Sequence, residues 1–144
     1  MSDPGLSADD ALLLLKRELE RPPFNAWMAP VALAADPVAR EVLIALPYRS
    51  EFSHDPDHAV YHGGVLATLV DVAGHAAVAV WHGSPTPTIS LQIEYLAPAL
   101  GGELRARGIL RKLGRSISRA DVEVSAGGKL VALGRGVFST AKRG

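Results

Sequence analysis

The residues best suited to chemistry lie in one short segment, where two glycines precede an apolar stretch that carries a single carboxylate. The segment reads His62-Gly63-Gly64-Val65-Leu66-Ala67-Thr68-Leu69-Val70-Asp71. Glycines at a helix start leave backbone N–H groups unobstructed, and the helix dipole favours negative charge on a ligand there. Asp71 lies two turns further along, so we expect its carboxylate to face the cavity that those amides line. An amide donor placed opposite a base is the geometry of acyl transfer.

Asp71 is the strongest candidate for a catalytic residue. A carboxylate inside an apolar helix costs several kcal/mol unless it is paired, hydrogen-bonded or protonated. Such a group suits general-base catalysis near neutral pH. The alternative is a structural aspartate that bonds the neighbouring backbone or pairs with His75 one turn on, and the sequence leaves both interpretations open.

The histidines divide into two that flank this segment and three that stand apart from it. His62 precedes the helix, where we expect it to hold the turn rather than to transfer a proton. His75 shares a helix face with Asp71, where it either orients the carboxylate or bonds a carbonyl group in the core. The other three lack the spacing of metal ligands, so no metal site is expected: His54, His58 and His82.

Composition bounds the class of protein. The 144 residues suit one domain, 48% are apolar and 21% charged, and the net charge of +0 provides no global attraction for nucleic acid or a membrane surface. The absence of cysteine excludes disulfides and thiolate chemistry and is compatible with the cytoplasm, where we expect the protein. No signal peptide is expected, and the apolar stretch over residues 65–81 is too short and too polar for a membrane span.

Local patterns predict the elements that position the segment. Ser7 predicts the start of an amphipathic helix that Pro22-Pro23 ends. Next come two short strands over residues 31–35 and 41–46, a polar loop over 48–61 and an apolar helix over 64–81. Four strands follow over 88–95, 103–111, 116–125 and 130–140, with a hairpin turn at Gly127-Gly128. On the strand over 88–95, one dry face is expected from Ile89, Leu91, Ile93 and Tyr95.

This order of elements predicts a single α+β domain over residues 1–144, in which an antiparallel sheet curls around the central apolar helix. Residues 1–30 form the N-terminal helix and a lead-in. The central helix is apolar around nearly its whole circumference, so burial on all sides is expected. One sheet cannot enclose such a helix. A second copy of the chain, joining sheet edges, would cover the open side.

Two other groups of residues admit both a structural and a functional interpretation. Phe24, Trp27 and Met28 either pack in the core or close over a ligand cavity. A basic group brackets Gly114 at a turn between strands, where it is either a solvated edge or a site for phosphates of a nucleotide-like carrier. The group consists of Arg111, Lys112, Arg115 and Arg119.

With these residues identified, the chain resembles the hotdog-fold thioesterases of the PaaI-like group, which is related to phenylacetic acid degradation. The resemblance covers residues 41–140. It is densest over residues 62–71, where the spacing from His-Gly-Gly to the acid matches, and it extends to the stretch Ile93-Glu94-Tyr95-Leu96-Ala97-Pro98. It implies a hydrolase acting on acyl-CoA thioesters with an aryl or medium-chain acyl group. It also implies sites between the subunits of a homodimer, or of a homotetramer built from two dimers.

The resemblance also assigns roles by position. Asp71 becomes the general base or nucleophile, and the Gly63 amide, next to Gly64, polarises the thioester carbonyl. Thr88 matches a hydroxyl that places the attacking water. Gly114 and Arg115 fall where a neighbouring subunit meets the coenzyme A moiety. No metal or redox cofactor is implied, because coenzyme A enters as part of the substrate.

The chain departs from the family pattern ahead of the histidine, where many relatives carry an Asn or Gln. Direct counting reaches Pro56, and Asp55 or Asp57 substitutes only if the loop is shifted by a residue. Two alternatives therefore remain. One is a hotdog protein that binds acyl-CoA without cleaving it, and the other is an acyl-thioester hydratase or dehydratase that uses a histidine as well as an acid.

Overall fold

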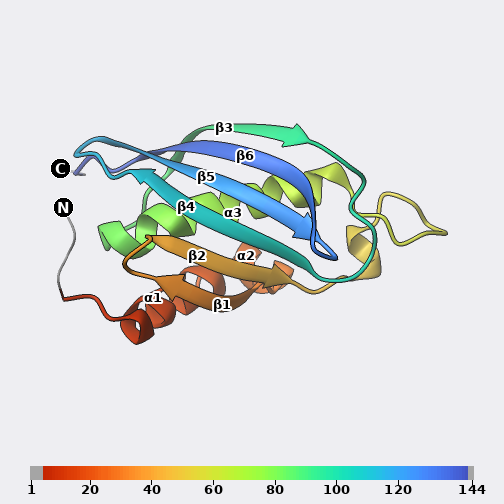
Figure 1. The fold of residues 1–144 in the computed structure, drawn as a ribbon, viewed down its shortest axis with the longest axis horizontal. Coiled ribbons are helices and arrows are strands. Elements are labelled where there is room, and N and C mark those ends of the chain that lie inside the picture. The colour runs from red at the N-terminus through yellow and green to blue at the C-terminus, as the bar shows by residue number, and fades with distance from the viewer. Residues whose placement is uncertain (1–4, 143–144) are drawn as a thin grey trace.

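One long helix lies along the concave face of a six-stranded antiparallel sheet in the computed structural model of the chain, which describes residues 5–142 (Figure 1). The helices are α1 Ala8–Glu20, α2 Pro23–Met28 and α3 Gly63–His82, with a 3-10 turn at Ser50–Phe52. The strands are β1 Val31–Asp36, β2 Glu41–Leu46, β3 Thr88–Tyr95, β4 Leu104–Lys112, β5 Ile117–Ala126 and β6 Lys129–Ser139. The sheet order is β1-β2-β4-β5-β6-β3. The predicted α+β architecture, a curled sheet around a central helix, is confirmed.

The local signals that predicted the elements act as expected. The Ser7 side chain caps α1 by accepting the N–H of Asp10, and Ala11, Leu15 and Leu19 form the buried stripe of this helix. At the other end of the chain, Gly127 and Gly128 both adopt positive φ (56° and 78°), the conformation that a tight turn between β5 and β6 requires. The strand boundaries differ from the predicted ones by at most one residue.

The central helix α3 packs closely on the sheet because small residues of the strands lie beneath it. A Cβ atom at Gly134 of β6 would overlap the side chain of Val70, so only glycine allows the helix this approach. The helix has 20 residues and extends one residue beyond the predicted range at each end. The expectation that it is too short and too polar for a membrane span is wrong, since its length and hydropathy match those of a span. However, 61% of its most apolar stretch is buried within the protein, as in the core helix of a globular domain.

Within a single chain α3 is not buried on all sides, and whether a second copy covers its open side stays a prediction. Gly64, Thr68, Asp71 and His75 recur at helical spacing and are exposed or half-buried, so one face of the helix is open. The expected dry face of β3 is open only at its two ends, where Ile89 is 57% exposed and Tyr95 55% exposed, while Leu91 and Ile93 are half-buried against the core. The reason is topological, since β3 is an edge strand and nothing in the described chain lies beyond it.

Candidate active site

The start of α3 presents an unused backbone donor. His62 is the N-cap residue, and its Nδ1 accepts the N–H of Gly64 at 2.8 Å, which agrees with the predicted turn-holding role. The N–H of Gly63 meets no acceptor among residues 5–142. One amide at the positive end of a 20-residue helix is therefore available to an oxygen atom that carries negative charge.

Two tyrosines fix this helix start. Tyr61 donates its backbone N–H to Ala99 O (2.9 Å) and its hydroxyl to Gly102 O, which ties the residue before the cap to the β3–β4 connection. Burial raises the pKa of Tyr61 to about 12, so the hydroxyl remains a donor over the working pH range. Tyr95, at the end of β3, donates its hydroxyl to Gly63 O at 2.8 Å. Sequence reasoning did not identify Tyr95 as part of the site.

Asp71 is half-buried on the open face of α3 and is held from β3. The hydroxyl of Thr88, the first residue of β3, donates to Asp71 Oδ1 at 2.7 Å. The carboxylate thus has one hydrogen-bond partner in the described chain, the Thr88 hydroxyl, and is accessible to a ligand from the open face of α3. The structure brings together the aspartate that the helix pattern singled out and the threonine that only the family resemblance indicated.

His75 contacts residues other than Asp71. Its Nε2 accepts the N–H of Thr86 at 3.4 Å, and its Nδ1 lies 3.6 Å from a carboxylate oxygen of Glu18 in α1. The described residues show neither of the two expected contacts, since His75 bonds neither Asp71 nor a carbonyl group and instead links three segments of the fold. Neither Thr86 nor Glu18 was identified from the sequence, because both are far from His75 along the chain.

The Gly63 amide and the Asp71 carboxylate of one chain are too far apart to act on one carbonyl group. Asp71 follows Gly63 by eight positions in the helix, which corresponds to about 12 Å along the axis at 1.5 Å per residue. Reacting groups need to lie about 3 Å apart. The cavity that the sequence led us to expect for both groups is therefore not formed by a single chain.

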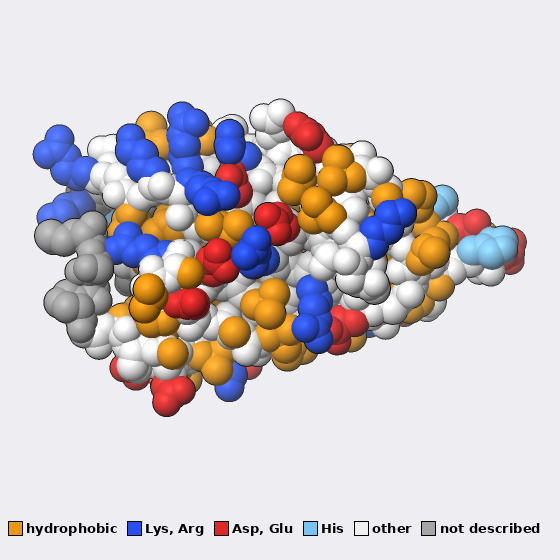
Figure 2. Space-filling view, in the orientation of Figure 1, with side chains coloured by type: hydrophobic (Ala, Val, Ile, Leu, Met, Phe, Trp, Pro, Cys, Tyr) orange, Lys and Arg blue, Asp and Glu red, His pale blue; other side chains and the backbone are white. Residues whose placement is uncertain are grey.

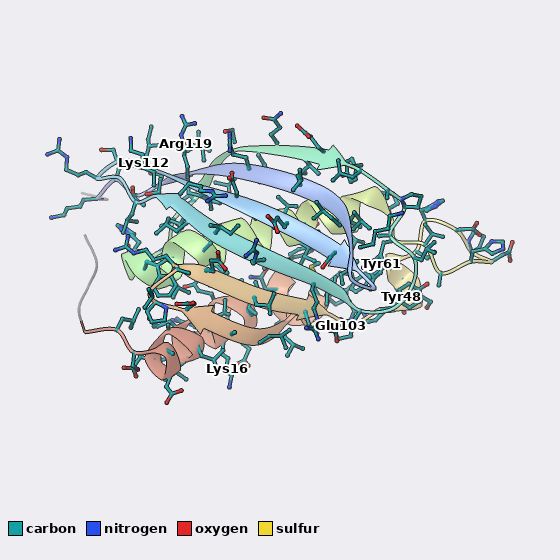
Figure 3. The ribbon with its side chains drawn as sticks, viewed as in Figure 1. Lys16, Tyr48, Tyr61, Glu103, Lys112 and Arg119 are labelled. Atoms are coloured by element: carbon teal, nitrogen blue, oxygen red, sulfur yellow. The ribbon has the colours of Figure 1, made fainter. Side chains whose placement is uncertain are left out.

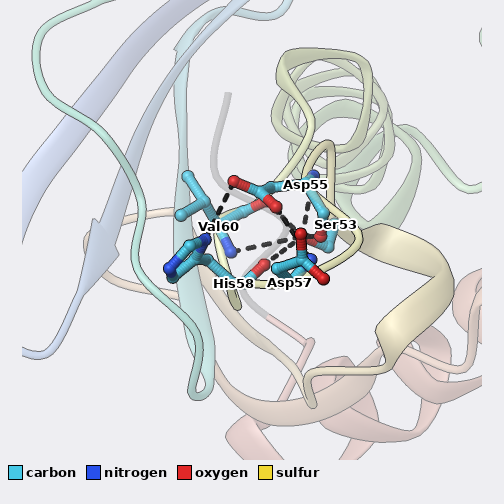
Figure 4. Close-up of polar contacts among 5 residues, drawn as sticks. All are labelled: Ser53, Asp55, Asp57, His58 and Val60. Carbon is cyan, nitrogen blue, oxygen red and sulfur yellow. Dashed lines mark hydrogen bonds and ion pairs between the residues drawn. The ribbon is translucent and has the colours of Figure 1, made fainter.

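The loop that precedes the helix is ordered by Ser53 and Asp55 (Figure 4). Ser53 Oγ accepts the backbone N–H of Val60 and lies 2.6 Å from His58 O, while Asp55 accepts the N–H of Asp57 at 2.8 Å and contacts His58 Nδ1 at 3.1 Å. The N–H of Asp57 and the His58 ring hold the pKa of Asp55 below its usual value. Pro56 and Asp57 lie in the exposed part of this loop.

The basic group and Gly114 lie at the other end of the molecule, where β4 turns into β5 (Figures 2 and 3). Gly114 is confined by the turn, since its N–H donates to Ser118 Oγ and its carbonyl accepts from Thr140 Oγ1. Arg111 is paired with Asp121 at 2.8 Å. The other three members are exposed and form no ion pair with any described residue: Lys112, Arg115 and Arg119.

A hollow of about 280 Å³ adjoins the helix start on the side of α2. Phe24, Trp27 and Met28 line it, together with residues of the first turns of α3. Met28 is buried, whereas Phe24 and Trp27 are more than half exposed, so the two rings are walls of a cavity rather than core residues. The guanidinium of Arg49 lies 4.7 Å from the centre of the Trp27 ring, which holds this wall in place.

Residues 5–142 contain no group of three or more histidine and acidic side chains arranged to hold a metal ion. The chemistry available from the described residues is therefore that of an unused amide, a fixed carboxylate with its hydroxyl partner, and imidazoles.

Comparison with known proteins gives similarities along most of the chain. The family model of the thioesterase superfamily matches residues 58–132. Acyl-coenzyme A thioesterase 13 of Mus musculus is 30% identical over 126 residues, which cover 85% of this chain and 88% of the mouse protein. A solved structure of a protein from the thioesterase superfamily is 36% identical with a TM-score of 0.84, and the match covers 90% of this chain and 97% of that one. A mutant form of the phenylacetic acid degradation protein PaaI from Thermus thermophilus is 29% identical with a TM-score of 0.70, over 82% and 98% of the two chains.

Proposed function

Because the chain belongs to the thioesterase superfamily and is a thioester hydrolase, we propose that its substrates are acyl-CoA thioesters with aryl or medium-chain acyl groups. The observation that carries the catalytic assignment is the pairing of an unused Gly63 N–H at a helix start with the Asp71–Thr88 hydrogen bond on the open face of the same helix. These groups supply an oxyanion donor and a base.

We propose that each active site is built from two copies of the chain. The distance along α3 prevents Gly63 and Asp71 of one chain from meeting at one thioester. A two-fold axis beside the open face of α3 and the free edge of β3 would bring Gly63 of one copy opposite Asp71 of the other. The same contact would cover Ile89 and the exposed helix face. We propose a homodimer that assembles further into a homotetramer.

The reaction then follows from the positions of the groups. Asp71 takes a proton from water, and the water oxygen attacks the thioester carbon while the carbonyl oxygen gains negative charge. The partner's Gly63 N–H, supported by the helix dipole, stabilises that charge. The carbonyl re-forms, the C–S bond breaks with its electron pair on sulfur, and the coenzyme A thiolate takes up the proton. Direct attack by Asp71 on the carbon is the other route open to this geometry.

The remaining site residues have supporting roles in this proposal. His62 and Gly64 hold the helix start, Thr88 aims the carboxylate, and His75 anchors the segment that leads into β3. Gly114 and Arg115 of a neighbouring copy would meet coenzyme A, whose phosphates the exposed basic group suits. Pro56 and Asp57, in the exposed loop that precedes the helix, would border the entrance to the substrate site. The hollow beside Phe24 and Trp27 would take the acyl group. We further propose a cytoplasmic protein that needs no metal or redox cofactor and binds neither nucleic acid nor membranes.

The test is release of thiol from acyl-CoA by the purified protein, followed with a thiol reagent. We expect Asp71→Asn to lower kcat by about 100-fold or more while thermal unfolding stays unchanged. Binding of acyl-CoA without thiol release by the parent protein would show a binding module instead. Parental turnover by Asp71→Asn would remove the catalytic assignment. Hydration of an enoyl-CoA that depends on His62 or His75 would indicate a hydratase.

A further inference from the structure

We propose that the imidazole of His54 is a second hydrogen-bond donor to the thioester carbonyl, beside the Gly63 N–H of the same chain. This inference rests on the proposed function and deepens it. It also accounts for the position ahead of the His-Gly-Gly motif, where Pro56 has no polar side chain.

The observation that carries the proposal is a hollow of about 400 Å³ at the start of α3, which His54 and Gly63 line together. Apart from the two tyrosines, the other residues around it are apolar, among them Val60, Leu66 and Pro98. A carbonyl group bound in this hollow at the start of α3 would therefore lie between Gly63 and His54. The hollow is open to solvent, so a bound thioester would displace water from it.

His54 is the lining residue whose polar side chain is still available. The hydroxyl of Tyr95 already donates to Gly63 O, and the hydroxyl of Tyr61 donates to Gly102 O. The ring of His54 has no hydrogen-bond partner among residues 5–142, whereas its backbone N–H is fixed to Val60 O at 3.0 Å. The backbone is anchored, and the exposed imidazole can exchange water for an oxygen of the substrate.

The neighbouring polar groups are already engaged. His62 Nδ1 accepts the N–H of Gly64, so its ring is held in the cap. Asp55, next to His54, accepts the N–H of Asp57 and contacts the ring of His58. The carboxylate of Asp55 therefore does not take the His54 proton.

The experiment compares His54→Ala with His58→Ala, because both remove an imidazole from the same loop and only the first removes it from the hollow. We expect His54→Ala to lower kcat by about 10- to 100-fold with KM nearly unchanged, since the bond strengthens as charge develops on the oxygen. His58→Ala should stay within about twofold of the parent. His54→Asn, whose amide also donates, should recover part of the loss.

Two results would overturn the inference. One is parental kcat in His54→Ala. The other is an equal loss in His58→Ala, which would show that order of the loop, and not the imidazole, matters. Both leave the proposed function intact if Asp71→Asn is inactive. A parent protein that releases no thiol would instead refute the proposed function, and this inference with it.

Discussion

Replacement of Gly63 by proline would remove the N–H that we assign to the oxyanion while leaving the fold in place. Gly63 is the first residue of α3, where proline is well tolerated because its missing N–H has no partner within the helix. The preceding His62 has φ −60° and ψ 136°, a conformation that proline permits. A Cβ atom there would meet the Tyr95 ring at 3.4 Å, an ordinary contact. Loss of one oxyanion donor should lower kcat by about 10²- to 10³-fold.

Gly63→Ala is the matched control, since it adds the same Cβ and keeps the N–H. We expect this variant to retain activity within a few-fold of the parent, and all variants to unfold at the parental temperature. If Gly63→Pro and Gly63→Ala had equal kcat values, the amide would not be the donor. Steady-state thiol release over a range of substrate concentrations measures both kcat and KM.

Mixing two inactive variants then tests whether the site is shared between chains. In a dimer of one Gly63→Pro chain and one Asp71→Asn chain, a shared arrangement leaves one site with both groups intact. Random pairing after co-refolding makes half of the dimers mixed, so about a quarter of parental activity should return. A site within one chain would regain nothing, because every chain lacks one group. If no activity returned although mixed dimers had formed, the proposal that Gly63 and Asp71 of different chains share one site would be refuted.

Three further predictions follow from individual contacts. Thr88→Val removes the donor to Asp71 Oδ1 and should lower kcat by about tenfold with little change in KM, measured by the same thiol assay. Trp27→Ala opens the wall of the hollow and should lower kcat/KM for aryl substrates more than for short aliphatic ones, measured with an acyl-CoA panel. Ion pairs with Arg135 and Arg111 lower the pKa of Asp121, so its stabilisation is complete above the ordinary value of 3.8 and is lost as the pH falls through the lowered pKa. Urea unfolding between pH 6 and about pH 2 should therefore show a smaller loss in Asp121→Asn than in the parent.

The elements of the fold were predictable because each depends on a local signal. Ser7 and Pro22 bound α1, and the alternation along β4 and β5 reflects strands with one buried face. The burial of each face was not predictable, because an apolar face on a helix or strand does not indicate which part of the chain, or which second copy, packs against it. Ile89 is apolar and yet exposed in one chain, because its strand lies at the edge of the sheet.

The site was predictable only in part. Gly63 and Asp71 stand out by chemistry and spacing, whereas Thr88 is a threonine at a strand start and has no pattern of its own. Tyr95 lies 32 residues from Gly63 along the chain, and its hydrogen bond to that residue exists only after β3 has packed beside α3. Contacts of this kind depend on the topology of the sheet, which the sequence indicates in outline but not in register.

The proposed assembly and the proposed catalysis depend on the same side chains. Thr88 and Tyr95 stand at the two ends of the edge strand β3, and each donates a hydrogen bond to α3, one to Asp71 and one to Gly63 O. A second copy that pairs with this edge would bury both ends, shield the carboxylate from bulk solvent and leave the Gly63 N–H facing inward. Exclusion of water strengthens a hydrogen bond to a charged oxygen. In the proposed assembly the amide would therefore contribute most, because the other chain would supply the base that it needs.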